Sequence, residues 1–341
     1  MIVRIGLVSV AALALASCNS GSSQIKLIGS STVYPFSKAV AKAFADAKKG
    51  EEPLVEETGT VTGFERFCDG GGAESIDIAD ASRRMTRKEY QRCESKGAGP
   101  IMEVPIGLDG IVVAESNAGP KMALTRKDIY LALAAFPRGQ ANTAKTWKDV
   151  NPSLPATPIK VLGPPATSGT RAEFQQLIMQ AGCLDAAPDA KALLSSADPG
   201  QLDKTCRQIR TDGAYQEAGE NDDRIVDALE KEPNTLGIFG YSFLQKNDAR
   251  LNGVTIDGFA PDVDTIASGK YPATRTLYLY VKLANLSAKP AVKDFLDMYM
   301  SMWAPGGPLA KLGLVAMSDG GRRKSADIIK DKTPLEDTVL P

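Results

Sequence analysis

The sequence contains no histidine among its 341 residues. Histidine is the side chain whose ordinary pKa lies near neutral pH, so its absence excludes imidazole acid–base catalysis, Ser-His-Asp and Cys-His nucleophile pairs, and histidine-ligated zinc or iron. A strong charge of one sign is also lacking: 40 Lys and Arg stand against 41 Asp and Glu, which argues against bulk nucleic-acid binding. The chain is 43% hydrophobic and long enough for two folded domains, and the lack of histidine favours a binding protein over an enzyme.

The apolar run Ile5 to Ala16 follows Arg4 and is short for a membrane-spanning helix, as in a secretory signal. It leads into Leu15-Ala16-Ser17-Cys18, which resembles the lipobox of bacterial lipoproteins. That resemblance implies that residues 1–17 are removed as a signal peptide, that lipid is attached to Cys18, and that residues 18–23 form a flexible tether. An ordinary secretory signal followed by a chance cysteine is the alternative.

Cysteine is scarce, and the spacing of Cys68, Cys93, Cys183 and Cys206 fits no Cys-x-x-Cys metal or redox pattern. We therefore expect no metal and no cofactor. An exported chain favours disulfides, and Cys68–Cys93 with Cys183–Cys206 is the most economical of the three pairings. Buried free thiols are the alternative.

Short β-rich runs alternate with amphipathic helical runs, which is the pattern of an α/β fold with a mostly parallel sheet. Three of these units share one form, in which a strand leads into a loop of hydroxyl-bearing residues and glycine and then into a helix. The predicted strands are residues 24–28, 54–57 and 159–162, and the loops are residues 29–32, 58–63 and 163–170. Thr170 with Glu173 has the spacing of a capping box at the third helix start.

Such loops have the chemistry needed to hold an oxyanion. The first turn of a helix leaves N–H groups unpaired, the helix dipole favours negative charge there, and Ser or Thr adds a neutral donor. Each loop alone is equally typical of ordinary helix capping. Their repetition favours an anion site, and none of them matches the nucleotide P-loop.

Several separated motifs resemble those of the PstS family, the phosphate-binding proteins of bacterial phosphate ABC transporters. The motifs occur in the family's order across nearly all of the mature chain: Gly29 to Phe36, Gly59-Thr60 with Gly63-Phe64 and Phe67-Cys68, Ala81-Ser82-Arg83, Thr167 to Thr170, Leu236 to Tyr241, and Ala267 to Pro272. The resemblance implies a two-lobed type II periplasmic-binding-protein fold, with two mixed sheets flanked by helices and joined by two crossing strands. It also implies phosphate held between the lobes, delivery to permease subunits, and no catalysis.

The lobes of such a fold are joined by two extended segments, and residues 105–115 and 274–282 are strand-like and suitably placed. Lobe I would then comprise residues 24–110 and 276–341, and lobe II residues 111–275. Each expected disulfide falls within one lobe. We expect a monomeric, periplasmic protein that is anchored to the membrane through Cys18.

The resemblance also implies a set of phosphate-binding residues from both lobes. In lobe I they are Ser31, Thr32, Val33, Thr60 and Ser82, and in lobe II they are Ser168, Gly169 and Thr170.

The sequence departs from the family where the best-known members have an arginine and an aspartate just before Ser-Gly-Thr, because Pro164 to Thr167 stands there. Arg83 and Arg171 adjoin matched motifs and are the candidate cations, with solvated surface arginines as the alternative reading. Asp80 is the first candidate to accept the phosphate proton, and Asp222 is the second. The acidic run from Gly219 to Asp223 is otherwise explained as a helix N-terminus.

Two alternatives remain open. A receptor of the same fold for sulfate, molybdate or another oxyanion fits the same loops. An exported phosphate-ester hydrolase would need metal ligands or an activated nucleophile, and neither stands out in the sequence.

Overall fold

The computed structural model describes residues 24–48, 51–72, 74–187, 192 and 199–341. The predicted signal peptide, the tether and the lipidation residue Cys18 lie outside the described residues. Within the described ranges, no helix has the length and apolar character needed to cross a membrane.

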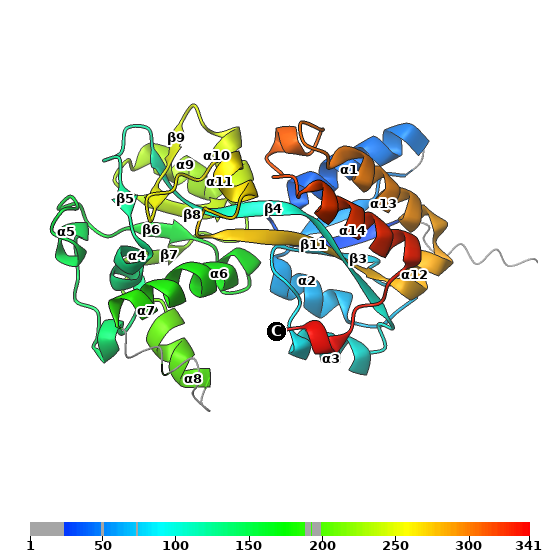
Figure 1. The fold of residues 1–341 in the computed structure, drawn as a ribbon, viewed down its shortest axis with the longest axis horizontal. Helices are drawn as coiled ribbons and strands as arrows, with labels where there is room; N and C mark the ends of the chain where they lie inside the picture. Colours follow the sequence, from blue (N-terminus) through cyan, green and yellow to red (C-terminus); the bar gives the residue numbers. More distant parts are fainter. Residues whose placement is uncertain (1–23, 49–50, 73, 188–191, 193–198) are drawn as a thin grey trace, which may run out of the picture.

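The described strands form a continuous mixed sheet in the order β2-β1-β3-β11-β4-β8-β6-β7, and β9 also pairs with β4. The strands of this sheet are β1 (Lys26–Gly29), β2 (Leu54–Glu57), β3 (Ile78–Ala81), β4 (Ile101–Ser116), β6 (Val161–Gly163), β7 (Tyr215–Glu217), β8 (Leu236–Gly240), β9 (Leu251–Gly253) and β11 (Thr274–Lys282). Two short strands, β5 (Ala123–Leu124) and β10 (Thr255–Ile256), pair separately. Figure 1 shows two lobes with β4 and β11 running between them.

Strand β4 takes part in both lobes because it changes partner along its length. Residues 101–110 pair antiparallel with β11, and residues from Ile111 onward pair with β8 and β9. We call the part built on β1, β2, β3 and β11 lobe I, and the part built on β6, β7, β8 and β9 lobe II. The expected crossing segments 105–115 and 274–282 lie within β4 and on β11.

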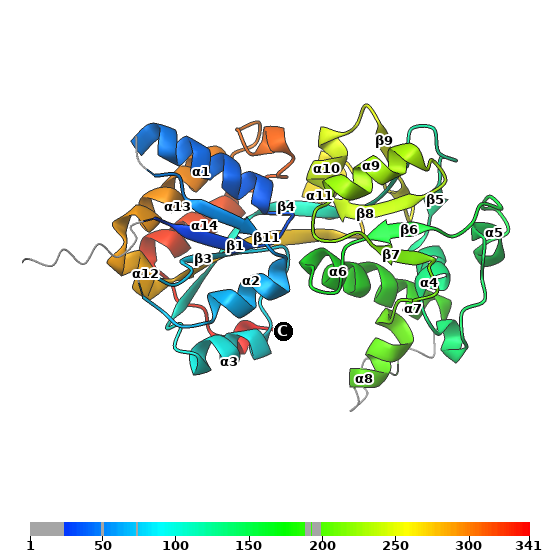
Figure 2. The same ribbon diagram turned by 180° about the vertical axis from the view of Figure 1, so that it is seen from behind.

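In lobe I, helices cover both faces of the sheet (Figures 1 and 2). One face carries α1 (Tyr34–Lys48), α13 (Pro290–Met302) and α14 (Asp319–Asp331), and the other carries α2 (Thr60–Phe67) and α3 (Arg87–Ser95). The helix α12 (Leu283–Ala288) follows β11 directly. The two faces hold separate hydrophobic clusters, centred on Phe36 and Phe295 on one side and on Phe64 and Tyr280 on the other.

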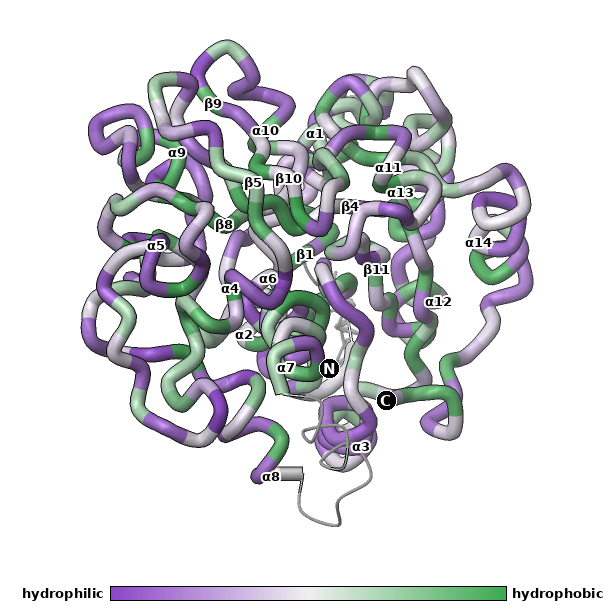
Figure 3. The backbone as a smooth tube through the Cα atoms, turned by 60° about the vertical axis from the view of Figure 1, so that its left-hand side comes forward, coloured by the Kyte–Doolittle hydropathy of each residue, from purple (hydrophilic) through white to green (hydrophobic). Residues whose placement is uncertain are grey.

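Lobe II has one hydrophobic cluster around β8, in which Phe174, Ile225 and Phe239 are buried. Its helices are α4 (Arg126–Leu133), α5 (Trp147–Val150), α6 (Gly169–Phe174), α7 (Ala181–Ala186), α8 (Pro199–Leu202), α9 (Asp223–Lys231), α10 (Tyr241–Lys246) and α11 (Val263–Ala267). π-Helical turns at Gln175–Gln180 and Asp203–Arg207 extend α6 and α8. Figure 3 shows that β8 is hydrophobic, whereas helix α3 on the outside of lobe I is hydrophilic.

The predicted strand, loop and helix units are present, with shifted ends. The first strand spans Lys26–Gly29 instead of 24–28, and the third spans Val161–Gly163 instead of 159–162. The capping box expected at Thr170 and Glu173 is wrong. Helix α6 begins at Gly169, and its cap is Ser168, whose side chain accepts a hydrogen bond from the Thr170 N–H. The disulfides Cys68–Cys93 and Cys183–Cys206 are both present, one in each lobe.

Candidate anion-binding site

The candidate site lies where the carboxyl ends of the strands in the two lobes face each other. β1, β2 and β3 run parallel, so the loops after them leave the sheet at one edge. β6, β7 and β8 are likewise parallel in lobe II. This is the edge at which open α/β sheets place their ligand loops. The predicted hydroxyl residues all lie in these loops or in the first turn after them.

The hydroxyl groups of both lobes meet within hydrogen-bonding distance. In lobe I, the Oγ1 atom of Thr60 lies 3.2 Å from the Oγ atom of Ser82. Across the lobes, the Oγ1 atoms of Thr32 and Thr170 lie 3.1 Å apart. These four side chains and Ser168 are buried, so the predicted hydroxyls form one cluster inside the protein.

Three of these hydroxyl oxygens already accept a hydrogen bond from an N–H group. Thr60 Oγ1 accepts from the backbone of Ser82, and Ser168 Oγ accepts from the backbone of Thr170. Thr32 Oγ1 accepts from the guanidinium of Arg275 at 3.0 Å. A hydroxyl has one O–H to donate, and accepting an N–H does not use it. In each of the two hydroxyl pairs one O–H donates to the other oxygen, so one O–H of each pair and that of Ser168 remain to donate.

The lobes are in contact at the cluster. The backbone N–H of Val61 in lobe I donates to the carbonyl of Thr167 in lobe II at 3.2 Å. A Cβ atom added at Gly169 would lie 2.5 Å from both Ser82 Oγ and Thr60 Oγ1. The approach of the two loops therefore depends on the absence of a side chain at Gly169.

The other predicted lobe I residues occupy the turn before α1. Ser31 and Val33 are buried there, and the Val33 N–H faces the Ser30 hydroxyl at 3.4 Å. The structure thus brings Ser31, Thr32 and Val33 into one turn beside the hydroxyl cluster.

The two arginines proposed from sequence have partners in their own lobes, although the buried Nε atom of Arg171 has no hydrogen-bond partner among the described residues. Arg83 donates two hydrogen bonds to the carboxylate of Glu89, at 2.6 and 2.8 Å, and lies over the ring of Phe64. Arg171 stacks on the ring of Tyr215, 4.3 Å from its centroid, and donates to the carbonyl of Pro164. Both side chains therefore have partners within their own lobe.

An arginine that sequence reasoning missed reaches the cluster from a crossing strand. Arg275 in β11 lies opposite Asp109 in β4, and its Nε and Nη2 atoms lie 2.9 and 2.7 Å from Asp109 Oδ2. The same guanidinium donates to Thr32. The available signal was a charged residue inside each of two strand-like segments, Asp109 and Arg275, whose other charged residues, Glu115 and Lys282, stand at the segment ends.

Two buried aspartates have raised pKa values and different surroundings. Burial raises the pKa of Asp80 to about 8, and its carboxylate accepts a hydrogen bond from Ser37 in α1. Burial also raises the pKa of Asp222 well above its ordinary value, with Arg275 opposing and Glu57, Asp109 and Glu220 adding to the shift. Neither carboxylate oxygen of Asp222 has a hydrogen-bond partner among the described residues. Its side chain does not cap α9, contrary to the capping interpretation of the acidic run.

Two further carboxylates face each other across the lobes. Glu220 accepts a hydrogen bond from the Thr167 hydroxyl at 2.5 Å and packs against Gly59. The pKa of Glu57, at the end of β2, is raised first by burial and then by Glu220 and Asp223. The cleft therefore has a carboxylate side beside its hydroxyl cluster.

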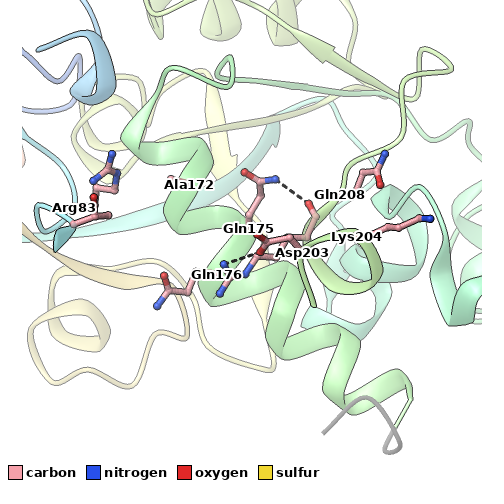
Figure 4. Close-up of a pocket in the computed structure, with 9 residues that line it drawn as sticks. Arg83, Ala172, Gln175, Gln176, Asp203, Lys204 and Gln208 are labelled. Carbon is pink, nitrogen blue, oxygen red and sulfur yellow. Dashed lines mark hydrogen bonds and ion pairs between the residues drawn. The ribbon is translucent and has the colours of Figure 1, made fainter. Parts of the chain in front are cut away.

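A groove of about 710 Å³ lies between Arg83 of lobe I and the π-helical turns that follow α6 and α8 in lobe II. Figure 4 shows Gln175, Gln176, Asp203, Lys204 and Gln208 along it, with Arg83 at its far end. Gln175 donates to the carbonyl of Arg207 there. The hydroxyl cluster does not line this groove.

The fold and the cleft define a two-lobed binding protein of the type II periplasmic class. A model of the PBP superfamily domain matches residues 16–302, and the chain belongs to that superfamily. The chain is similar to the SphX protein of Synechococcus elongatus, with 28% identity over 80% of this chain and 72% of that protein. It is also 28% identical to the phosphate-binding protein PstS of Staphylococcus saprophyticus, over 84% of this chain and 78% of that protein. The resemblance to PstS proteins is therefore confirmed.

Solved structures share the fold. An ABC-type phosphate transport receptor from Vibrio cholerae superposes with a TM-score of 0.58 and 18% identity, covering 86% of this chain and 99% of that one. The periplasmic phosphate-binding protein PfluDING, solved with phosphate bound, gives a TM-score of 0.64 at 13% identity, covering 89% and 93%. The predicted two-lobed type II fold is confirmed.

Proposed function

We propose that this protein binds inorganic phosphate between its lobes and delivers it unchanged to the permease of an ABC transporter. The observation that carries the proposal is the buried cluster of hydroxyls from both lobes, in which Thr32, Thr60 and Ser168 each accept an N–H and one O–H of each hydroxyl pair remains to donate. The homology to PstS proteins supports phosphate as the anion.

The chemistry of the cluster suits a multiply charged oxyanion. Phosphate offers oxygen acceptors in all directions, and neutral hydroxyls can donate to it without bringing further charges into the cleft. The proposed donors are the side chains or backbone of Ser31, Thr32, Val33, Thr60, Ser82, Ser168, Gly169 and Thr170. Because both lobes donate, binding stabilises the closed arrangement of the lobes, residues 24–110 with 276–341 and residues 111–275.

We further propose an exported, periplasmic and monomeric protein that is attached to the membrane through lipid on Cys18. A labelled fatty acid should enter the wild-type chain in a bacterial host. Equal labelling of a Cys18→Ala variant would refute attachment at that residue.

Isothermal titration of the mature protein with phosphate tests the ligand. We expect one site per chain and a rise in melting temperature at saturating phosphate, because a ligand that binds only the folded state stabilises it. No heat and no melting shift would refute the proposal. Parallel titrations with sulfate and molybdate test the other oxyanions, and release of phosphate from a phosphate ester would show a hydrolase instead.

A further inference from the structure

We propose that Arg275, on the crossing strand β11, is the cationic ligand of the anion and that Asp109 on β4 positions it. This inference rests on the proposed anion site and assigns its charge to the connection between the lobes. It replaces Arg83 and Arg171, the two candidates next to the sequence motifs.

The guanidinium of Arg275 is buried and only partly satisfied by the protein. Its side chain is 2% exposed. Nε and Nη2 are directed to Asp109, and Nη2 also donates to Thr32 Oγ1. Nη1 has no hydrogen-bond partner among the described residues. Because a buried unsatisfied donor is unfavourable, particularly when charged, the free Nη1 indicates a bound acceptor.

The guanidinium group that carries the free donor lies beside the hydroxyl cluster. Thr32 Oγ1 is bonded both to Arg275 and, across the lobes, to Thr170 Oγ1 at 3.1 Å. The guanidinium therefore adjoins a hydroxyl pair that belongs to the anion cluster. A charge-assisted bond from it would add to the neutral donors on the same side of the cleft.

Both carboxylate oxygens of Asp109 have partners. Its Oδ2 atom faces Nε and Nη2 of Arg275, and its Oδ1 atom accepts from the backbone N–H of Tyr241, which begins α10. Burial raises the pKa of Asp109, and the positive charge of Arg275 opposes that shift. The carboxylate fixes the rotamer of Arg275 and ties β11 to lobe II.

This placement links the ligand to the strands that join the lobes. A hydroxyl donor belongs to one lobe, whereas Arg275 and Asp109 face each other on β11 and β4, both of which run between the lobes. A bound anion would thus contact Arg275, which is paired with Asp109 in the ladder between the two strands that join the lobes.

The first test is the phosphate affinity of Arg275→Gln and Arg275→Lys, measured by titration at fixed pH and salt. Loss of a charge-assisted bond should weaken binding by about tenfold to hundredfold in Arg275→Gln. The affinity of Arg275→Lys should lie between those of Arg275→Gln and the wild type, because lysine keeps the positive charge but lacks the planar set of N–H donors of arginine. The control is Arg210→Gln, another buried arginine with a carboxylate partner, Asp212, that lies away from the cluster and should leave affinity unchanged.

A double-mutant cycle tests the positioning role of Asp109. Asp109→Asn should weaken phosphate binding in the wild type and have little effect on affinity in Arg275→Gln, because its contribution passes through the arginine. Equal effects in both backgrounds would show a merely structural Asp109 and overturn its assigned role. If Arg275→Gln does not fold, Arg275→Lys and Asp109→Asn carry the same test.

The outcomes separate this inference from the proposed function. If the wild type binds phosphate and Arg275→Gln binds equally well, the assignment of Arg275 is wrong and phosphate binding stands. A larger loss in Arg83→Gln or Arg171→Gln than in Arg275→Gln also overturns it. If the wild type does not bind phosphate, the proposed function itself fails.

Discussion

The two lobes present the same architecture to the cleft and different chemistry. In each, parallel strands end at the cleft and hydroxyl-bearing loops follow them. Lobe I offers mainly neutral donors, such as Thr60 and Ser82, whereas lobe II adds the buried carboxyl group of Asp222. The cation Arg275 lies on a crossing strand. The comparison teaches that similar folds can divide donors, acceptors and charge among different segments.

The largest expected loss of phosphate affinity comes from adding a negative charge to the neutral hydroxyl cluster. Ser168→Asp keeps an oxygen to cap α6 and places a negative charge beside the proposed anion. Two unit charges 4 Å apart interact by about 4 kcal/mol at an effective dielectric constant of 20, so phosphate affinity should fall about a thousandfold. Ser168→Ala is the matched control and should lose about tenfold or less in the same titration. Equal affinities of the wild type and Ser168→Asp would remove this residue from the site.

A smaller effect follows from separating the lobes sterically. Gly169→Ala places a methyl group 2.5 Å from Ser82 Oγ and Thr60 Oγ1. Overpacking of this kind typically costs about 1–3 kcal/mol, and here it falls on the contact between lobes, so affinity should drop about tenfold to hundredfold. Gly320→Ala in α14 is the control, because its new Cβ atom would lie 4.0 Å from the nearest atom outside its chain neighbours and its own helix backbone, Ser318 Oγ. Unchanged phosphate binding in Gly169→Ala would show that the lobes do not close through this contact.

The carboxyl group of lobe II should set the preference between anions. Protonated phosphate can donate a hydrogen bond to Asp222, whereas sulfate at neutral pH has no proton to donate. Unpaired buried groups cost about 1–3 kcal/mol, so Asp222→Asn should reduce the preference for phosphate over sulfate by about tenfold or more in a competition assay. Asp80→Asn should leave the preference unchanged, because Asp80 is bonded to Ser37 beneath α1. The opposite result would restore Asp80 as the acceptor.

The smallest expected effect concerns Glu57 and Glu220 on the carboxylate side of the cleft. The pKa of Glu57 is raised in the folded protein, so its favourable contribution is complete below its ordinary pKa and is lost as pH rises through the raised value. Glu57→Gln should therefore flatten the decline of melting temperature above pH 4.5 without lowering stability at neutral pH. Melting curves from pH 4 to 8 in the absence of phosphate measure this. A steeper decline in Glu57→Gln would contradict the assigned cause.

Local features of this site could be predicted from sequence, and long-range ones could not. The turn at Thr32 and the hydroxyl-bearing loop from Thr167 to Thr170 follow from residues within one strand, loop and helix unit, so composition indicates them. The capping box expected at Thr170 and Glu173 was wrong because the cap of α6 is Ser168, two residues before Thr170. The pairing of Arg275 with Asp109 depends on the register of two strands that are 166 residues apart. No local pattern encodes that register.

The side chains of Arg83 and Asp222 make different contacts from those expected from the sequence. Arg83 adjoins a matched motif, yet Glu89 lies six residues further on and accepts hydrogen bonds from both Nη atoms of its guanidinium group. Adjacency in sequence placed its backbone near the cleft without fixing where its side chain points. Asp222 shows the converse, since an acidic helix start was expected to cap α9 and its oxygens are left unpartnered among the described residues.

Two glycines, Gly107 and Gly110, flank Asp109 in the part of β4 that connects the lobes. A Cβ atom at Gly107 would collide with Leu314, and one at Gly110 would collide with Ile266 and approach Tyr271, so bulk at either position is resisted by packed side chains. Glycine also permits backbone rotations that other residues resist. Residues 107–110 therefore combine close packing against Leu314 and Ile266 with two positions at which the backbone carries no side chain. In the proposed function, rotation about these residues would let the lobes move relative to each other while the ladder between β4 and β11 keeps the two strands in register.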